Sequence, residues 1–258
     1  MLTFAKKKIC RIYAKVKAKK IYPDKLSLNT SDFLSKPVSL NIAIIDDENF
    51  VYKDAILSKG HKVVQYDSYF TKKPRKENLI PIDLSKFDII LCDINGVDAG
   101  VYAGSDGLSV MSDMREKYPL HVIAAYTGSP GSIYKRESFK ADLLDKVFSR
   151  DWEVDDFLLN LQRLTDIFIK PKDRWNFIKT RLNYLGVDEE NIDKVRVVFS
   201  ENILYGKMLN EKFKFSPEES YTMVSDSESR IDISTLTNYG ITALKIGSLL
   251  KPVFTGTP

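Results

Sequence analysis

Short apolar runs alternate with stretches of helical periodicity along the middle of the chain. The runs have the composition of buried strands and cover residues 40–45, 61–66, 88–93, 121–126 and 146–148. Helical patterns cover about residues 50–59, 108–117, 139–144 and 154–168. Residues 67–81, rich in lysine, indicate a basic loop where a helix would normally be expected. Strands that alternate with helices predict an α/β fold, a doubly wound parallel sheet with right-handed crossovers.

The two ends of the chain lack this alternation. We expect residues 1–38 to form a basic amphipathic segment and a connector, residues 39–169 the α/β domain, and residues 170–258 a helical C-terminal module. The apolar side chains of the first segment fall on one helical face, and lysines occupy the remainder of the helix. The apolar residues are Ala5, Ile9, Ile12, Tyr13 and Val16. Such a helix suits an anionic membrane surface or an acidic partner. The alternative is a helix docked on its own protein with a solvated basic face.

Charge and cysteine content limit the class of protein. The 258 residues carry a formal net charge of +4. Residues 1–20 hold eight of the 39 basic residues and none of the 35 acidic ones, which leaves 31 against 35, or −4, for the rest of the chain. Two cysteines cannot build a disulfide framework, and no apolar run approaches the roughly 20 residues that cross a bilayer. We therefore expect a cytoplasmic protein.

Four of the predicted strands end on polar side chains. Asp46 and Asp47 follow the first strand, Asp93 ends the third, Thr127 follows the fourth, and Arg150 follows the fifth. Because parallel strands bring their carboxyl ends to one edge of a sheet, we expect these groups to share a cleft. Clustered carboxylates repel one another unless a cation neutralises them, and Mg²⁺ prefers oxygen ligands of this kind. An aspartate beside Mg²⁺ can attack phosphorus while a hydroxyl and a cation hold the phosphoryl oxygens.

Each of these residues also has a simpler interpretation. Acids that follow a strand often cap the next helix, which would explain Asp46 and Asp47 without a metal. Thr127 alone fits a turn at a strand end, and Arg150 alone fits an ion pair with a neighbouring surface acid. The register of the acidic pair with Asp93 and Thr127 favours a shared site over capping.

Five short motifs follow one another along this part of the chain. They are Ile44-Ile45-Asp46-Asp47-Glu48, Ile90-Leu91-Cys92-Asp93-Ile94-Asn95, Asp106-Gly107-Leu108, Ala125-Tyr126-Thr127-Gly128 and Val147-Phe148-Ser149-Arg150. In this order they resemble the receiver domains of bacterial two-component response regulators. The resemblance covers about residues 39–165 and implies a flavodoxin-like fold with a five-stranded parallel sheet, flanked here by the basic N-terminal helix and the helical C-terminal extension.

The resemblance also implies a role for each site residue. Asp93 would be the phosphoacceptor, and Thr127 would be the switch hydroxyl. Mg²⁺ would be held by carboxylates and by one backbone carbonyl, from Asp46, Asp47, Asp93 and Asn95. The phosphoryl donor would be a histidine kinase or a small acyl phosphate, and a homodimer is a further expectation. No helix-turn-helix is evident after residue 170, so DNA binding is not expected.

Departures from the family pattern leave two alternatives open. Arg150 stands where the family has Lys, Asp151 replaces the usual Pro, and Val147 takes the position of the aromatic switch residue. These changes are compatible with a degenerate receiver that acts as a protein-interaction module without phosphorylation. Residues 93–97 also resemble the first motif of haloacid-dehalogenase-like phosphatases, although Asn95 cannot replace their general acid.

Overall fold

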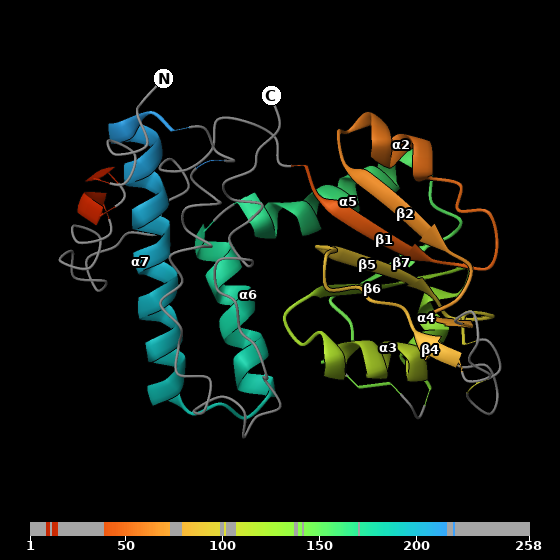
Figure 1. Cartoon of the computed structure of the whole chain (residues 1–258). Helices are drawn as coiled ribbons and strands as arrows, with labels where there is room; N and C mark the ends of the chain where they lie inside the picture. Colours follow the sequence, from red (N-terminus) through yellow and green to blue (C-terminus); the bar gives the residue numbers. More distant parts are fainter. Residues whose placement is uncertain are drawn as a thin grey trace. The chain divides into compact units, whose positions relative to one another are not determined.

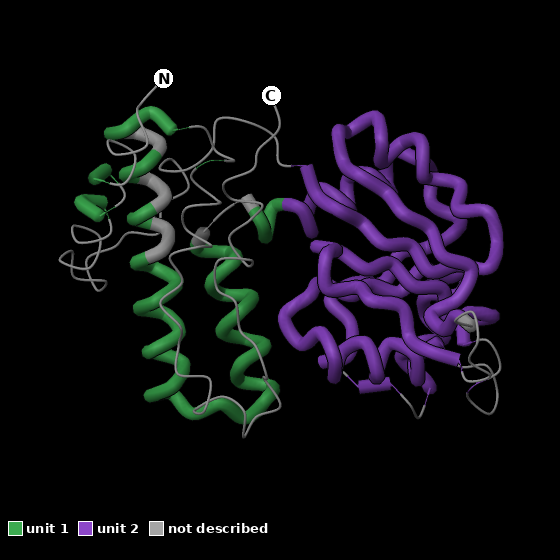
Figure 2. Tube along the Cα trace, viewed as in Figure 1, with its two compact units in different colours: residues 1–38, 166–258 green, residues 39–165 purple. Residues whose placement is uncertain are grey.

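The computed structural model describes residues 9–10, 12–14, 39–72, 79–98, 101, 107–136, 139–140, 142–169, 171–215 and 219. The chain divides into two compact units, residues 39–165 and residues 1–38 with 166–258 (Figure 2). The three-part division expected from the sequence, with boundaries after residues 38 and 169, stays a prediction.

A five-stranded parallel sheet forms the centre of the unit of residues 39–165 (Figure 1). Its strands are β1 (Asn41–Ile45), β2 (Lys62–Tyr66), β5 (Ile89–Asp93), β6 (Val122–Thr127) and β7 (Lys146–Ser149). They pair in the order β2-β1-β5-β6-β7, parallel throughout. Counted among these strands alone, the order is 2-1-3-4-5, the flavodoxin-like arrangement with its switch point between β1 and β5. The predicted fold class is confirmed.

Helices cover both faces of this sheet, which explains the near-continuous apolar sequences of the central strands. Every residue of β5 and β6 is buried. On one face α3 (Gly107–Lys117) packs into the core through Val110, Met111 and Met114 (Figure 1). The other face holds an aromatic cluster beside α2 (Lys53–Ser58) and the first turns of α5 (Val154–Ile169), in which the rings of Tyr52 and Phe157 stack 4.1 Å apart. A single short helix, α4 (Pro130–Ile133), follows β6.

A hairpin occupies the segment for which we predicted a basic loop. β3 (Phe70–Lys72) pairs with β4 (Leu79–Pro81) in antiparallel register, so the prediction of a loop was wrong for these residues. Residues 73–78 lie outside the described part of the chain. The hairpin forms because Tyr69 and Phe70 are buried in the same core as α3. Its base is joined to the loop after β5, since the backbone N–H of Tyr69 donates to the carbonyl oxygen of Val97 at 2.9 Å.

The helix predicted at residues 139–144 is also absent from the described part of that segment. Residues 139–140 and 142–144 form turns and irregular backbone. The carbonyl oxygen of Leu143 accepts hydrogen bonds from the guanidinium of Arg115 at 3.1 and 3.2 Å. Arg115 also pairs with Asp145 at 2.9 Å, and the side chains of both residues are nearly buried. Contacts with α3 therefore replace the internal hydrogen bonds of a helix.

The second unit is helical where it is described, as predicted for the C-terminal extension. α6 (Pro171–Tyr184) and α7 (Glu189–Phe213) pack through Trp175 and Phe199, whose ring centroids lie 5.6 Å apart. Residues 9–10 and 12–14 are helical, and Tyr13 contacts the Phe213 ring. The remainder of the predicted N-terminal helix, and residues 216–258 apart from 219, lie outside the described residues. Among the described helices, none has the length and apolarity of a membrane span.

Candidate functional site

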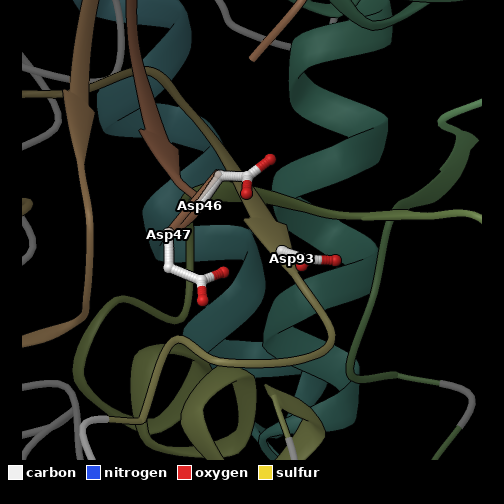
Figure 3. Close-up of side chains that lie close together, drawn as sticks. All are labelled: Asp46, Asp47 and Asp93. Atoms are coloured by element: carbon white, nitrogen blue, oxygen red, sulfur yellow. The ribbon is translucent and has the colours of Figure 1, made fainter. Parts of the chain in front are cut away.

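Three acidic side chains meet at the carboxyl edge of the sheet (Figure 3). Asp46 and Asp47 follow β1, and Asp93 is the last residue of β5, the strand paired with β1. One carboxylate oxygen from each residue lies within 4.8 Å of the others. Asp46 and Asp93 are buried, whereas Asp47 is exposed. The structure therefore brings together the three carboxylates that we predicted as metal ligands.

Asp46 has one satisfied and one unsatisfied carboxylate oxygen. Oδ1 accepts the backbone N–H of Glu48 at 2.9 Å. Oδ2 is buried and has no hydrogen-bond partner among the described residues. Burial raises the pKa of Asp46 to about 6; the charge of Asp93 adds to this rise, and the Glu48 N–H opposes it. A buried oxygen without a donor, beside two further carboxylates, is an environment that a hard cation would stabilise.

The acidic pair does not cap the next helix. α2 begins at Lys53, several residues after Asp47, and its N-cap residue is Tyr52, without a side-chain capping bond. The capping interpretation of Asp46 and Asp47 is therefore wrong.

Asp93 is held in one orientation by both of its carboxylate oxygens. Oδ1 accepts the backbone N–H of Ile94 at 2.7 Å, and Oδ2 accepts Nη2 of Arg150 at 2.9 Å. Burial raises the pKa of Asp93, while the Ile94 N–H and the charge of Arg150 act in the opposite direction. The side chain is only 5 % exposed, so a group that reacts with it must approach from the carboxyl edge of the sheet.

Arg150 reaches across the sheet edge from the end of β7. Besides Asp93, its Nη2 lies 3.7 Å from Oδ2 of Asp46, and its Nη1 pairs with Glu48. The guanidinium lies over the ring of Tyr126, with its central carbon 5.2 Å from the ring centroid. These contacts connect Arg150 to the acidic cluster, in contrast to the simpler interpretation that paired it with a neighbouring surface acid.

The two remaining predicted residues border the cluster. Thr127, at the end of β6, is buried, and its Oγ1 accepts the N–H of Ser129 at 3.3 Å. Its carbonyl oxygen accepts the backbone N–H of Arg150 at 2.9 Å. The side chain of Asn95 is exposed, and its backbone N–H interacts with Asp93. The roles assigned to these residues by resemblance stay predictions.

Two glycines beside the cluster are constrained, Gly96 by its backbone conformation and Gly107 by close packing against main chain. Gly96 has φ +74°, and a Cβ there would lie 2.2 Å from Oδ2 of Asp47. A Cβ on Gly107 would lie 2.5 Å from the carbonyl oxygen of Asp93, which is fixed main chain. The sequence contained a signal for both positions, an Asn-Gly turn and an Asp-Gly pair before a helix, but not the reason for either.

Three further residues orient the site and were not predicted as part of it. Glu48 and Tyr126 contact the guanidinium of Arg150. The hydroxyl of Tyr52 lies 3.0 Å from the carbonyl oxygen of Arg150 and also contacts the carbonyl of Trp152. Tyr52 and Arg150 are 98 residues apart, so no local pattern in the sequence could have linked them.

Some solved structures are similar to part of this chain. No protein-family model and no curated protein matches the sequence. Similar solved structures include the response regulator TrrA of Thermotoga maritima, with 15 % identity, coverage of 48 % of this chain and 98 % of that chain, and a TM-score of 0.35. The HemR receiver domain of Leptospira biflexa has 15 % identity, covers 49 % and 94 %, and has a TM-score of 0.37. NtrX of Brucella abortus has 10 % identity, covers 71 % and 46 %, and has a TM-score of 0.38.

The strand order of the sheet, and not these similarities, defines the flavodoxin-like fold that the resemblance to receiver domains implied. These identities carry no information about the chemistry of the site.

Proposed function

We propose that residues 39–165 form a receiver-like signalling domain in which Asp93 accepts a phosphoryl group. One observation carries the proposal: the buried carboxylate of Asp93 lies within 4.8 Å of two further carboxylates and is paired with Arg150 at 2.9 Å. An acid in this setting combines a nucleophilic oxygen with a cationic side chain that can stabilise a transferred phosphoryl group.

The donor set fits a divalent cation with oxygen ligands. Asp46, Asp47 and Asp93, with the backbone carbonyl of Asn95, would hold Mg²⁺, and Oδ2 of Asp46 is the buried oxygen that still lacks a donor. When bound, Mg²⁺ would offset the charge between these carboxylates and the phosphoryl oxygens.

The nucleophile and the groups that bind the phosphoryl oxygens are side chains of this protein. An oxygen of Asp93 forms a bond to phosphorus while the bond to the donor breaks, and the donor leaves with the electron pair of that bond. The donor is a phosphohistidine of a histidine kinase or a small acyl phosphate. Arg150 can stabilise the transferred oxygens by charge. Oγ1 of Thr127 accepts the Ser129 N–H, which leaves its own proton for a phosphoryl oxygen.

Intact-mass spectrometry after incubation with acetyl phosphate and Mg²⁺ tests this proposal. We expect the mass of one phosphoryl group in the unaltered protein and none in Asp93→Asn. Asp67→Asn, which removes an exposed acid at the end of β2, is the matched control and should still be labelled. Labelling of Asp93→Asn would disprove the assignment of Asp93.

A second candidate function is that of a docking module which does not turn over phosphate. The observation that favours it is the position of Arg150, whose Nη2 already lies between the carboxylates of Asp93 and Asp46. Absence of labelling together with measurable Mg²⁺ binding would support this candidate over phosphoryl acceptance.

We also infer that the N-terminal segment offers an apolar face to an anionic lipid surface. The side chains of Ile9 and Ile12 are 67 % and 56 % exposed, whereas Ala14 is completely buried. Of the predicted apolar face, Tyr13 contacts the Phe213 ring, whereas Ile9 and Ile12 stay exposed. Co-sedimentation with phosphatidylserine vesicles should be lost in Ile9→Asp/Ile12→Asp and retained in Leu57→Asp, a control at an exposed apolar residue of α2. Equal binding by both variants would contradict the inference.

A further inference from the structure

Arg150 contacts three acids, and the two nearest, Asp93 and Glu48, differ in position and burial. Its Nη2 pairs with Asp93, whose side chain is 5 % exposed, and its Nη1 pairs with Glu48, whose side chain is 68 % exposed. A planar guanidinium can bind two acids at the same time, whereas the ammonium of a lysine offers a single charged centre. Arg150, at the position where receiver domains have Lys, can therefore be held by a second acid.

The backbone of Arg150 is fixed by hydrogen bonds. Within the guanidinium, Nη1 and Nη2 are the atoms that pair with acids. Its N–H donates to the carbonyl of Thr127, and its carbonyl accepts the hydroxyl of Tyr52. Nε is buried and has no hydrogen-bond partner among the described residues. The orientation of the guanidinium over the Tyr126 ring therefore depends on Glu48 at one end and on the buried acids at the other.

Glu48 is itself placed by hydrogen bonds from two neighbouring elements. Its backbone N–H donates to Oδ1 of Asp46 at 2.9 Å. Its carbonyl oxygen accepts Nε2 of Gln65, a residue of β2, at 2.7 Å. The same Gln65 nitrogen lies 3.2 Å from the carbonyl oxygen of Asp46. The main chain of Glu48 is thus fixed at the edge of the site while its carboxylate extends toward solvent.

We propose that Glu48 is a positioning residue that retains Arg150 beside the acidic cluster when Asp93 gives up its ion pair with Nη2. This inference rests on the proposed function, because a cation or a phosphoryl group at Asp93 is what would displace Nη2. A side chain held only by Asp93 and Asp46 would then swing into solvent. A side chain held also by Glu48 stays within reach of the reacting oxygens.

The order parameter of the Arg150 Nε–H group, measured by NMR relaxation and assigned by its loss in Arg150→Lys, tests the proposal. In the unaltered protein we expect a value above about 0.8 both without Mg²⁺ and at saturating Mg²⁺. In Glu48→Gln we expect the same value without Mg²⁺ and a fall below about 0.6 at saturation. Glu153→Gln removes an exposed glutamate at the start of α5 and should behave as the unaltered protein. Equal order in Glu48→Gln and the unaltered protein at saturation would overturn the proposal.

A second arm separates this proposal from the proposed function. If the unaltered protein binds no Mg²⁺, the cation assignment fails, and Glu48 is then tested by removing the charge of Asp93. We expect Arg150 to stay ordered in Asp93→Asn and to become mobile in Asp93→Asn/Glu48→Gln. Equal order in these two variants would overturn the positioning role without reference to any metal. Thermal unfolding of each variant establishes that it is folded.

Discussion

Gly107 lies so close to Asp93 that a Cβ at position 107 would come within 2.5 Å of the Asp93 carbonyl oxygen. The N–H of Gly107 also donates to the carbonyl of Ile94 at 2.7 Å. The first residue of α3 thus rests on the main chain that carries the phosphoacceptor candidate. The two segments cannot move apart to admit a methyl group without breaking this bond.

Gly107→Ala should therefore destabilise the protein by about 1–3 kcal/mol, because the clash is with main-chain atoms in a packed core. Denaturant unfolding measures the change. Gly131→Ala, in α4, is the matched control, since a Cβ there meets no atom within 4 Å. Equal stability of the two variants would show that α3 can shift without cost.

Asp47→Ala should weaken Mg²⁺ binding at least about tenfold without loss of stability, because Asp47 is an exposed member of the carboxylate cluster. Tryptophan fluorescence during a Mg²⁺ titration gives the affinity, since Trp152 lies two residues from Arg150. Asp67→Ala is the control for loss of one exposed acid. An unchanged affinity in Asp47→Ala would remove this residue from the ligand set.

Arg115→Met should lower the free energy of unfolding by about 3 kcal/mol. The substitution leaves the carboxylate of Asp145 and the carbonyl of Leu143 without their guanidinium partner in a nearly buried position. Arg163→Met, at an exposed position of α5, should change stability by less than about 0.5 kcal/mol. A small effect of Arg115→Met would mean that the segment after Phe139 is held by other contacts.

His61 should make stability depend on pH. Burial lowers the pKa of His61, and Nδ1 accepts the N–H of Leu40 at 3.3 Å. The unfolded chain, with a pKa of about 6.5 for this group, takes up the proton more readily. The stability contributed by neutral His61 is therefore complete above that pH and is lost as the pH falls below it.

The difference in unfolding free energy between the protein and His61→Asn isolates this effect. Asn keeps an acceptor for the Leu40 N–H and does not titrate. Asp46, whose pKa is raised to about 6, contributes the opposite trend in the same range, but it is present in both proteins and cancels. Parallel stability profiles between pH 5.5 and 7.5 would contradict the prediction.

The sequence predicted those features that depend on residues close together in the chain. Apolar runs that end in acids predicted the strands and the meeting of Asp46, Asp47 and Asp93, because parallel topology brings the carboxyl ends of strands together. The hairpin of β3 and β4 was missed because the lysines and the proline that follow Tyr69 and Phe70 in the sequence are typical of a loop. The burial of the two aromatic residues has no signal in the local sequence. The helix at 139–144 was predicted from local spacing, whereas the fixed contacts there come from Arg115 on another element.

The contacts around Arg150 could not be predicted for a similar reason. Its partners Glu48 and Asp93 precede it by 102 and 57 residues, and only the completed sheet brings them within reach. The sequence identified the charge at this position and its departure from lysine. It contained no information on how many acids the guanidinium would contact.

The hairpin has a consequence for how the site communicates with the rest of its unit. The Tyr69 amide is bonded to Val97, and the hydroxyl of Ser68 lies 2.7 Å from the same carbonyl oxygen. The segment after Asp93 is thus bonded to the base of the hairpin, since Val97 contacts Ser68, which lies 29 residues before it in the sequence. A doubly wound sheet ordinarily has a helix in place of this hairpin. A rearrangement of the residues after Asp93 would break the hydrogen bond between the Tyr69 N–H and Val97. Deuterium exchange of the Tyr69 amide would therefore report a change at the acidic cluster, although Tyr69 is not part of it.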